Sequence, residues 1–192
     1  GKQLMPSPVK QVALELVCPG FTPDRNRRDR ECQQALARLN TDLSVVVAFG
    51  QILPKSVLEQ PPLGCWNGHG SLLPRWRGAG PIQWSLLEGD PETGVGVMAM
   101  EEGLDTGPVL LERRCRIGLL ETAEELALRL SAVTAELMLD ALPRIASAGE
   151  GPQELRWQRL GVTAQQERNG EVTYARMLTK DCLLYTSPSP RD

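Results

Sequence analysis

The sequence contains few of the residues from which several common kinds of site are built. Aromatic residues make up 4% of its 192 residues, and His69 is its single histidine. So few aromatic side chains argue against a surface that stacks on several nucleic-acid bases. One histidine cannot complete a Cys/His zinc cluster of the usual spacing, so we expect no metal site.

Charge, cysteine pairs and long apolar runs are scarce as well. The net charge is −3, which gives no whole-protein field that would attract a polyanion. No apolar run approaches the ~18 residues that span a membrane. The composition, 41% hydrophobic and 23% charged, is typical of globular proteins. The cysteines form no Cys-x-x-Cys pair and suit a reducing, intracellular compartment; they are Cys18, Cys32, Cys65, Cys115 and Cys182.

Helical and strand periodicities alternate along the chain. Residues 9–17 carry apolar side chains at helical spacing behind a Ser-Pro cap, which predicts a helix covering one face of a sheet. Residues 43–49 are apolar almost without a break, as in a parallel strand buried on both faces. Shorter patterns predict helices at 35–39, 54–58 and 81–87 and strands at 64–66, 93–100 and 108–117.

A long helix follows these strands. Thr122 and, three residues later, Glu125 form a capping-box signature, and the helical pattern continues to about residue 146. The alternation of strands and helices predicts an α/β fold with a doubly wound, mostly parallel sheet. The apolar face expected to be buried consists of Leu126, Leu130, Val133, Leu137 and Ala141.

The two ends of the chain differ from its middle. Only one fully apolar strand precedes the polar stretch at 67–83, so we expect a further βαβ unit of about 30 or more residues ahead of Gly1. Residues 153–181 are polar with isolated apolar positions, which predicts a connector, and the charged run at 24–30 predicts a solvated loop. Residues 182–192 look like a translated sequencing-library adapter and are left out of the fold prediction.

The polar stretch at 67–83 is the strongest candidate for a functional site. Asn67 and His69 stand two positions apart, so on an extended backbone their side chains point to the same side. Gly68 and Gly70 flank the histidine and leave its ring uncovered by neighbouring side chains. A strand followed by a glycine-rich loop and a helix is the place where an open α/β sheet presents its ligands.

These residue types point to acyl-transfer chemistry. An amide can donate to a developing oxyanion without changing its charge, and an imidazole can donate to it or pass a proton. Asp105, in a glycine-bounded loop, could orient the imidazole or accept a proton through a water. Each residue also has a structural interpretation, as a buried histidine and a turn aspartate. Cys65 lies in an apolar strand where a thiolate is disfavoured, and Asp105-Thr106-Gly107 is one triplet where an aspartic protease needs two.

Several motifs together resemble the folate-dependent formyltransferases. They are Asn67-x-His69, Ser71-Leu72-Leu73-Pro74, Arg75-Trp76-Arg77-Gly78, and Asp105 within Gly103-Leu104-Asp105-Thr106-Gly107. Residues 4–10 and Gly80-Pro81-Ile82-Gln83 are similar to the members of that family that act on a charged initiator tRNA. The resemblance covers residues 1–181.

The resemblance implies a fold, a reaction and a site. The fold is a Rossmann-like formyltransferase catalytic domain, incomplete, over residues 1–149, with 150–181 leading to a C-terminal β-barrel domain that is missing. The reaction is transfer of a formyl group from 10-formyltetrahydrofolate to the amino group of methionyl-initiator tRNA in translation initiation. The partners are this tRNA and the folate, without a metal or membrane, for a monomer in the cytoplasm or in an organelle. Asn67, His69 and Asp105 would be catalytic, and Ser71, Leu72, Leu73 and Pro74 would line the folate site.

Three departures from the family pattern modify this expectation. Members of the family carry a branched aliphatic residue where this chain has Gly68, and a glycine there is expected to loosen the strand end. The loop that reaches the tRNA acceptor end is cut, and the β-barrel domain is absent. We therefore predict that the chain as given is inactive. Two alternatives remain: a related formyltransferase or formyl-folate hydrolase with a small-molecule acceptor, and a non-catalytic α/β binding module.

Overall fold

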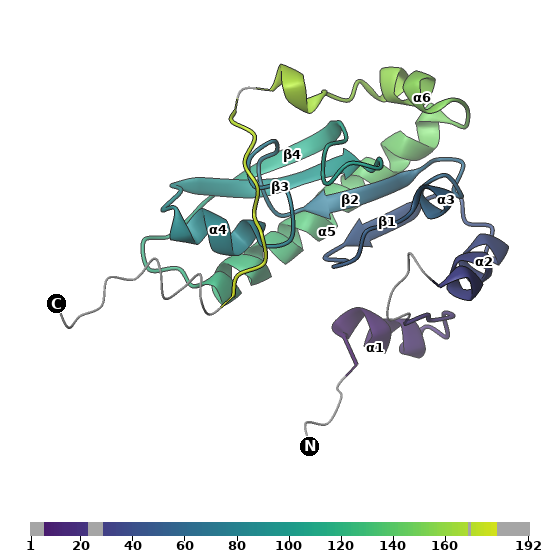
Figure 1. Cartoon of the computed structure of the whole chain (residues 1–192), viewed down its shortest axis with the longest axis horizontal. Helices are drawn as coiled ribbons and strands as arrows, with labels where there is room; N and C mark the ends of the chain where they lie inside the picture. Colours follow the sequence, from purple (N-terminus) through teal and green to yellow (C-terminus); the bar gives the residue numbers. More distant parts are fainter. Residues whose placement is uncertain (1–5, 23–28, 169, 180–192) are drawn as a thin grey trace.

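An open four-stranded sheet in the order β1-β2-β3-β4 forms the centre of the protein (Figure 1). The computed structural model describes residues 6–22, 29–168 and 170–179. The predictions for residues 24–28 and for 182–192 lie outside this part of the chain. The strands are β1 Ser44–Val47, β2 Cys65–His69, β3 Glu92–Ala99 and β4 Val109–Arg116.

The predicted α/β fold is confirmed, but the sheet is mixed where the sequence led us to expect mostly parallel pairing. β1 and β2 are parallel, whereas β2 with β3 and β3 with β4 are antiparallel. The segment 100–108 joins β3 to β4, and such a short connection suits antiparallel neighbours because a parallel crossover needs a dozen or more residues. β3 is buried along nearly its whole length. A strand buried on both faces has a continuous apolar sequence whether its neighbours are parallel or antiparallel, so the sequence of β3 resembles that of a parallel strand.

Helix α5, Ala123–Ala148, covers one face of the sheet (Figure 1). Its predicted start is confirmed, since the Thr122 side chain accepts from the Glu125 N–H while the Glu125 carboxylate accepts from the Thr122 N–H. Its apolar side packs against β3 and β4, and the predicted buried face is confirmed except that Val133 is only partly buried. The hydrophobic core that it forms with the sheet consists of Trp66, Val95, Val97, Ala99, Leu126, Leu130, Leu137, Met138, Ala141 and Ile145.

The N-terminal part of the chain departs from the prediction in its burial. Helix α1, Pro8–Glu15, begins at the predicted Ser7 cap, but Val9 is 79% exposed, so its apolar stripe covers no sheet face in the described part of the chain. β1 is parallel as predicted, yet Val45 and Val47 are about half exposed, at 46% and 50%. β1 is an edge strand, and Val47 lies on the sheet face against which α5 packs, but α5 makes its main contacts with β2, β3 and β4.

The stretch expected to be a connector packs against the rest of the protein, and its role as a connector stays a prediction. It contains helix α6, Gln153–Leu160, which packs on α5, and the short 3-10 helix η2, Gln165–Glu167. Beyond it the chain crosses in front of the sheet, and residues 173–175 pair through their backbone with the loop 74–80 (Figure 1). The isolated apolar positions of this stretch, Trp157, Leu160 and Val162, pack against the core. The remaining helices are α2 Arg30–Arg38, α3 Lys55–Leu58 and α4 Pro81–Leu87.

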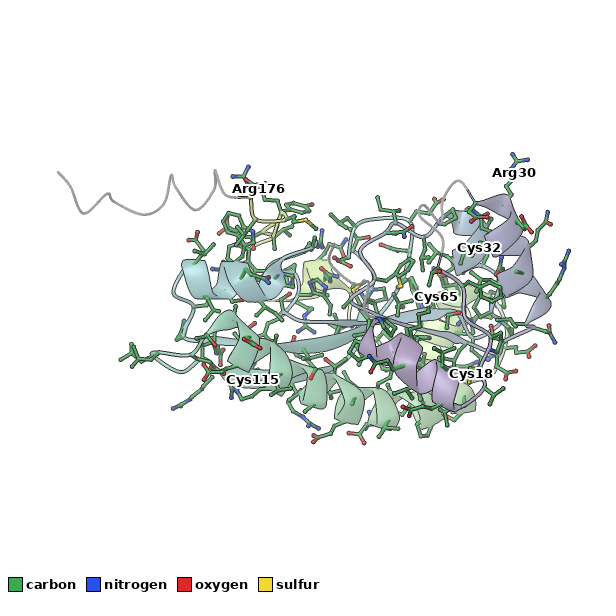
Figure 2. All side chains as sticks on the ribbon, turned by 90° about the horizontal axis from the view of Figure 1, so that it is seen from below. Cys18, Arg30, Cys32, Cys65, Cys115 and Arg176 are labelled. Atoms are coloured by element: carbon green, nitrogen blue, oxygen red, sulfur yellow. The ribbon has the colours of Figure 1, made fainter. Side chains whose placement is uncertain are left out.

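In Figure 2, Cys115 lies toward one side of the molecule and Cys18, Cys32 and Cys65 lie toward the other. Cys18, Cys32, Cys65 and Cys115 are free thiols, and burial raises the pKa of the Cys65 thiol. Among the described residues, no group of three or more His, Cys, Asp or Glu side chains is placed to hold a metal ion. The helices within the described ranges are all too short or too polar to cross a bilayer.

Candidate active site

Strand β2 carries two of the predicted site residues. Asn67 and His69 both lie within the strand, which pairs with β1 on one side and β3 on the other. Their side chains therefore project to the same side, as expected from their spacing. Asn67 is half-buried, whereas the His69 side chain is only 6% exposed.

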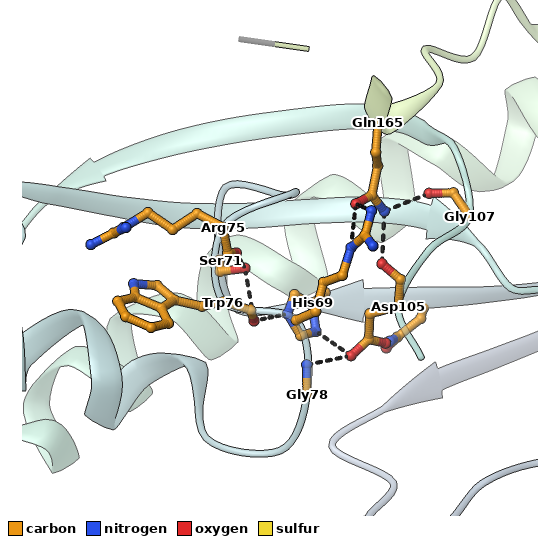
Figure 3. A network of polar contacts seen from close by, with 10 residues as sticks. His69, Ser71, Arg75, Trp76, Gly78, Asp105, Gly107 and Gln165 are labelled. Carbon is orange, nitrogen blue, oxygen red and sulfur yellow. Dashed lines mark hydrogen bonds and ion pairs between the residues drawn. The ribbon is translucent and has the colours of Figure 1, made fainter. Parts of the chain in front are cut away.

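Asp105 reaches the same place from the loop between β3 and β4. Its Oδ1 lies 3.4 Å from Asn67 Nδ2. Its Oδ2 lies 3.7 Å from His69 Nδ1 (Figure 3). The backbone of Asp105 adopts a left-handed conformation, with φ of 51°. The structure thus brings the three predicted side chains together from two strand ends.

The hydrogen bond of the His69 ring determines which nitrogen faces Asp105. His69 Nε2 lies 2.8 Å from the backbone oxygen of Trp76. A carbonyl oxygen only accepts, so in the neutral ring the proton resides on Nε2 and Nδ1 carries a lone pair. That lone pair and the Asp105 carboxylate are then both acceptors facing each other, a gap that an added proton or a donor from a substrate would bridge.

The loop 74–80 holds the second oxygen of Asp105 in place. The backbone N–H of Gly78 donates to Asp105 Oδ2 at 2.8 Å. Gly78 has φ of 111°, and a Cβ there would lie 2.9 Å from the carbonyl oxygen of Ala175. A glycine is required because both the backbone conformation and the space exclude a larger side chain.

The segment predicted to line a folate site, residues 71–74, packs against the loop 74–80 and bonds to it. Ser71 Oγ donates to the carbonyl oxygen of Arg75 at 2.6 Å. Ser71, Leu73 and Pro74 are almost fully buried, and Leu72 is the accessible member of the four. Their role in binding folate stays a prediction, and their burial means that a ligand would contact this segment mainly at Leu72.

Asp90 was not singled out by sequence reasoning, although it anchors the loop from outside. It accepts from Arg75 Nε at 2.9 Å, from Arg75 Nη2 at 2.6 Å, and from Trp76 Nε1 at 2.7 Å. Burial by itself would raise the pKa of Asp90, but the hydrogen bonds from Arg75 and Trp76 and the charge of Arg75 lower it overall. A lone aspartate after a helix gives no local pattern from which this role could be read.

Gly68, between Asn67 and His69, has a packing partner. A Cβ at this position would lie 2.5 Å from Cγ2 of Thr134 on α5. Thr134 is buried and held by a hydrogen bond from its Oγ1 to the backbone oxygen of Leu130 at 2.7 Å. The methyl group of Thr134 fills the space that a side chain at position 68 would occupy, and β2 keeps its pairing on both sides of Gly68.

The motif geometry has a counterpart in known proteins. The model of the formyl transferase family matches residues 1–142. The chain belongs to the formyl transferase family. This assignment covers the whole sheet, the loop 74–80 and the three converging side chains, whereas α6 and η2 lie beyond the matched region.

Relatives with high sequence identity extend the likeness beyond that region. A methionyl-tRNA formyltransferase from Synechococcus sp. (strain WH7803) is 70% identical over 181 residues, which is 94% of this chain and 52% of the relative. One from Synechococcus sp. (strain CC9311) is 67% identical over 180 residues, 94% of this chain and 53% of the relative. This formyl transferase chain therefore spans about half the length of the relatives it matches.

Solved structures share the fold at low sequence identity. The formyltransferase PseJ from Anoxybacillus kamchatkensis, solved with a UDP-linked formamido sugar and tetrahydrofolate, is 22% identical with a TM-score of 0.64. The similarity covers 92% of this chain and 85% of that protein. It confirms the predicted formyltransferase fold.

Proposed function

We propose that this chain is the catalytic part of a methionyl-tRNA formyltransferase. Its reaction would be transfer of a formyl group from 10-formyltetrahydrofolate to the amino group of methionyl-initiator tRNA. The observation that carries this proposal is the convergence of Asn67, His69 and Asp105 in a family domain whose relatives of 62–70% identity have that name. The division into a catalytic domain, 1–149, and a connector, 150–181, remains part of the proposal.

Asn67 would stabilise the charge that develops on the formyl oxygen. Attack of the amine on the formyl carbon forms a C–N bond and converts the carbonyl oxygen into a tetrahedral oxyanion. One N–H of the Asn67 amide faces Asp105. The other donates no hydrogen bond to a described residue and can donate to this oxygen. Such a donor contributes about 10²–10³-fold in rate.

His69 and Asp105 would handle the proton that the amine loses. The carboxylate of Asp105 is held by Gly78 and faces Nδ1 of His69. Either of these two acceptors, the Asp105 carboxylate or the Nδ1 lone pair of His69, can take the proton from the attacking nitrogen, directly or through a water. The C–N bond to the folate then breaks and the folate nitrogen takes up the proton, so the products are the formylated amine and tetrahydrofolate.

The test uses a complete protein, because the chain spans about half the length of its relatives. Residues 1–181 would replace the region they match in the Synechococcus sp. (strain WH7803) relative. The variants are His69→Ala and Asp105→Asn, with the exposed Asp140→Asn as the control. Formylation of methionyl-initiator tRNA should fall about 10²–10³-fold in the first two and stay unchanged in the third.

Two results would contradict the proposal. Unchanged formylation in both site variants would reject the catalytic assignment. Formylation of a nucleotide-linked amino sugar, with no activity on the tRNA, would favour the alternative with a small-molecule acceptor.

We also propose a cytoplasmic location, as expected for a translation enzyme with cyanobacterial relatives, and a monomer.

A further inference from the structure

Gln165 is a buried glutamine whose amide satisfies both its oxygen and its nitrogen within the protein. It lies in η2, beyond residue 142 where the family match ends, and is 2% exposed. Its Oε1 accepts from Arg77 Nε at 2.9 Å and from Arg77 Nη2 at 2.7 Å. Its Nε2 donates to the backbone oxygens of Asp105 and Gly107, both at 2.8 Å. The amide therefore joins two loops that are distant in sequence (Figure 3).

On one side, Gln165 fixes the loop that contacts His69 and Asp105 through its backbone. The Arg77 side chain is buried, and its backbone pairs with residues 173 and 175. Its two neighbours in the chain make the contacts described above. The backbone oxygen of Trp76 accepts a hydrogen bond from Nε2 of His69, and the backbone N–H of Gly78 donates to Asp105. Anchoring Arg77 therefore fixes both contacts.

On the other side, Gln165 holds the backbone that carries the catalytic carboxylate. Asp105 has φ of 51°, a conformation that a residue with a side chain rarely adopts without support. Gly107 lies so close to the carbonyl oxygen of Ala99 that a Cβ would overlap it. The two donors of Gln165 grip the carbonyls of Asp105 and Gly107 and so fix the direction in which the carboxylate leaves the backbone.

We propose that Gln165 is a positioning residue for the formyl-transfer reaction. By joining Arg77 to the Asp105 backbone, it sets the gap between the Asp105 carboxylate and the Nδ1 atom of His69. The proposal rests on the proposed function, because a reaction is needed for this gap to matter. It assigns a role in the chemistry to a segment outside the matched family region, and Gln165 acts only through Asp105 and Arg77.

Two substitutions separate the two sides of the amide. Gln165→Ala removes all four hydrogen bonds. Gln165→Glu keeps the shape and an oxygen for Arg77, but its carboxylate cannot donate to the carbonyls of Asp105 and Gly107. The matched control is Gln166→Ala, because this neighbouring glutamine is exposed.

The first measurement is the position of the His69 ring signals in NMR spectra of the 192-residue chain at one fixed pH. His69 is the only histidine, so its signals need no assignment. Both Gln165 variants should shift these signals because Asp105 moves relative to the ring, and Gln166→Ala should leave them in place. A thermal unfolding curve for each variant, recorded in parallel, reports any loss of stability separately.

The second measurement is kinetic, in the complete chimeric protein described above. Gln165→Ala and Gln165→Glu should lower kcat about 10- to 100-fold while KM for the formyl donor stays unchanged, because the carboxylate is misplaced but the donor still binds. If Gln165 had a purely structural role, its substitution would lower the unfolding temperature but would not lower kcat at an unchanged KM.

The outcomes distinguish this proposal from the proposed function. Unshifted His69 signals together with an unchanged kcat in both Gln165 variants would overturn the positioning role, whatever their stability. If Gln165→Ala does not fold, the same two readings on Gln165→Glu decide the matter. A parent chimera without formyl transfer would reject the proposed function, and shifted ring signals would then still support the hold of Gln165 on Asp105.

Discussion

The Nε2 atom of His69 lies 2.8 Å from the backbone oxygen of Trp76, and this contact gives the ring a fixed orientation and a fixed tautomer. The opposite nitrogen is left facing Asp105 across 3.7 Å, a distance too long for a direct hydrogen bond. Nδ1 of His69 and the carboxylate of Asp105 are both acceptors, so an N–H group of a substrate could bind between them.

The tautomer of His69 can be observed directly. We expect ¹⁵N spectra of the single histidine, in its neutral form, to show the proton on Nε2 and a lone pair on Nδ1. The reason is that Trp76 offers Nε2 only an acceptor. A spectrum with the proton on Nδ1 would contradict the arrangement of the ring.

Gly68 and Thr134 are expected to be energetically coupled. Gly68→Ala should lower the free energy of unfolding by about 1–3 kcal/mol, because its Cβ would meet the Thr134 methyl group. Thr134→Ser removes that methyl group and keeps the hydroxyl bonded to Leu130. The double variant should therefore recover most of the loss, as measured by chemical denaturation. Strictly additive effects of the two substitutions would show that the clash is relieved elsewhere.

The ion pair of Asp90 predicts a pH-dependent stability. Its lowered pKa means that the stabilisation is fully present above the ordinary value of 3.8 and is lost as pH falls from there through the lower pKa of the folded state. Asp90→Asn should cost about 1 kcal/mol at neutral pH, a modest value because Arg75 is partly exposed to screening solvent.

That difference between the parent chain and Asp90→Asn should shrink at pH values below 3.8. Denaturation curves at a series of pH values test it, with Asp140→Asn as the control because Asp140 is exposed and 3.8 Å from Arg113. A difference that stays constant down to the lowest pH would remove Asp90 as the titrating group.

Gly78→Ala should be among the most damaging glycine substitutions. It places a Cβ against the Ala175 carbonyl and strains a φ of 111°, so we expect a loss of about 2–3 kcal/mol in the free energy of unfolding. The control is Gly50→Ala, where nothing lies within 4 Å of the added Cβ. Similar stabilities for the two variants would indicate that residues 173–175 do not hold the loop in solution.

Local sequence patterns were enough to predict helix α5 and the direction of the two polar side chains on β2. The Thr122–Glu125 box and the helical spacing after it located α5, and the two-residue spacing of Asn67 and His69 placed both side chains on one side. The approach of Asp105 came from the family resemblance, because its partners are 38 and 36 positions away along the chain.

What the sequence did not indicate depends on contacts between distant segments. The direction of β3 is set by its partners, and its apolar side chains are compatible with either direction. Gln165 and Asp90 belong to polar stretches that carry no periodicity, and their roles come from carbonyl, guanidinium and indole groups that only the folded chain brings near. The predicted burial of Val9 and Val45 was wrong, because periodicity identifies the apolar face of an element but does not show which element packs against that face.

Two residues that contact His69 or its partner, Trp76 and Asp105, both have left-handed backbones, with φ of 61° and 51°. Each such conformation costs a residue with a side chain about 1 kcal/mol. Replacing Asp105 by glycine would relieve this strain but would also remove the carboxylate that accepts from the Gly78 N–H. The unfolding temperature of Asp105→Gly would therefore report the difference between the strain that is lost and the hydrogen bond that is lost with it.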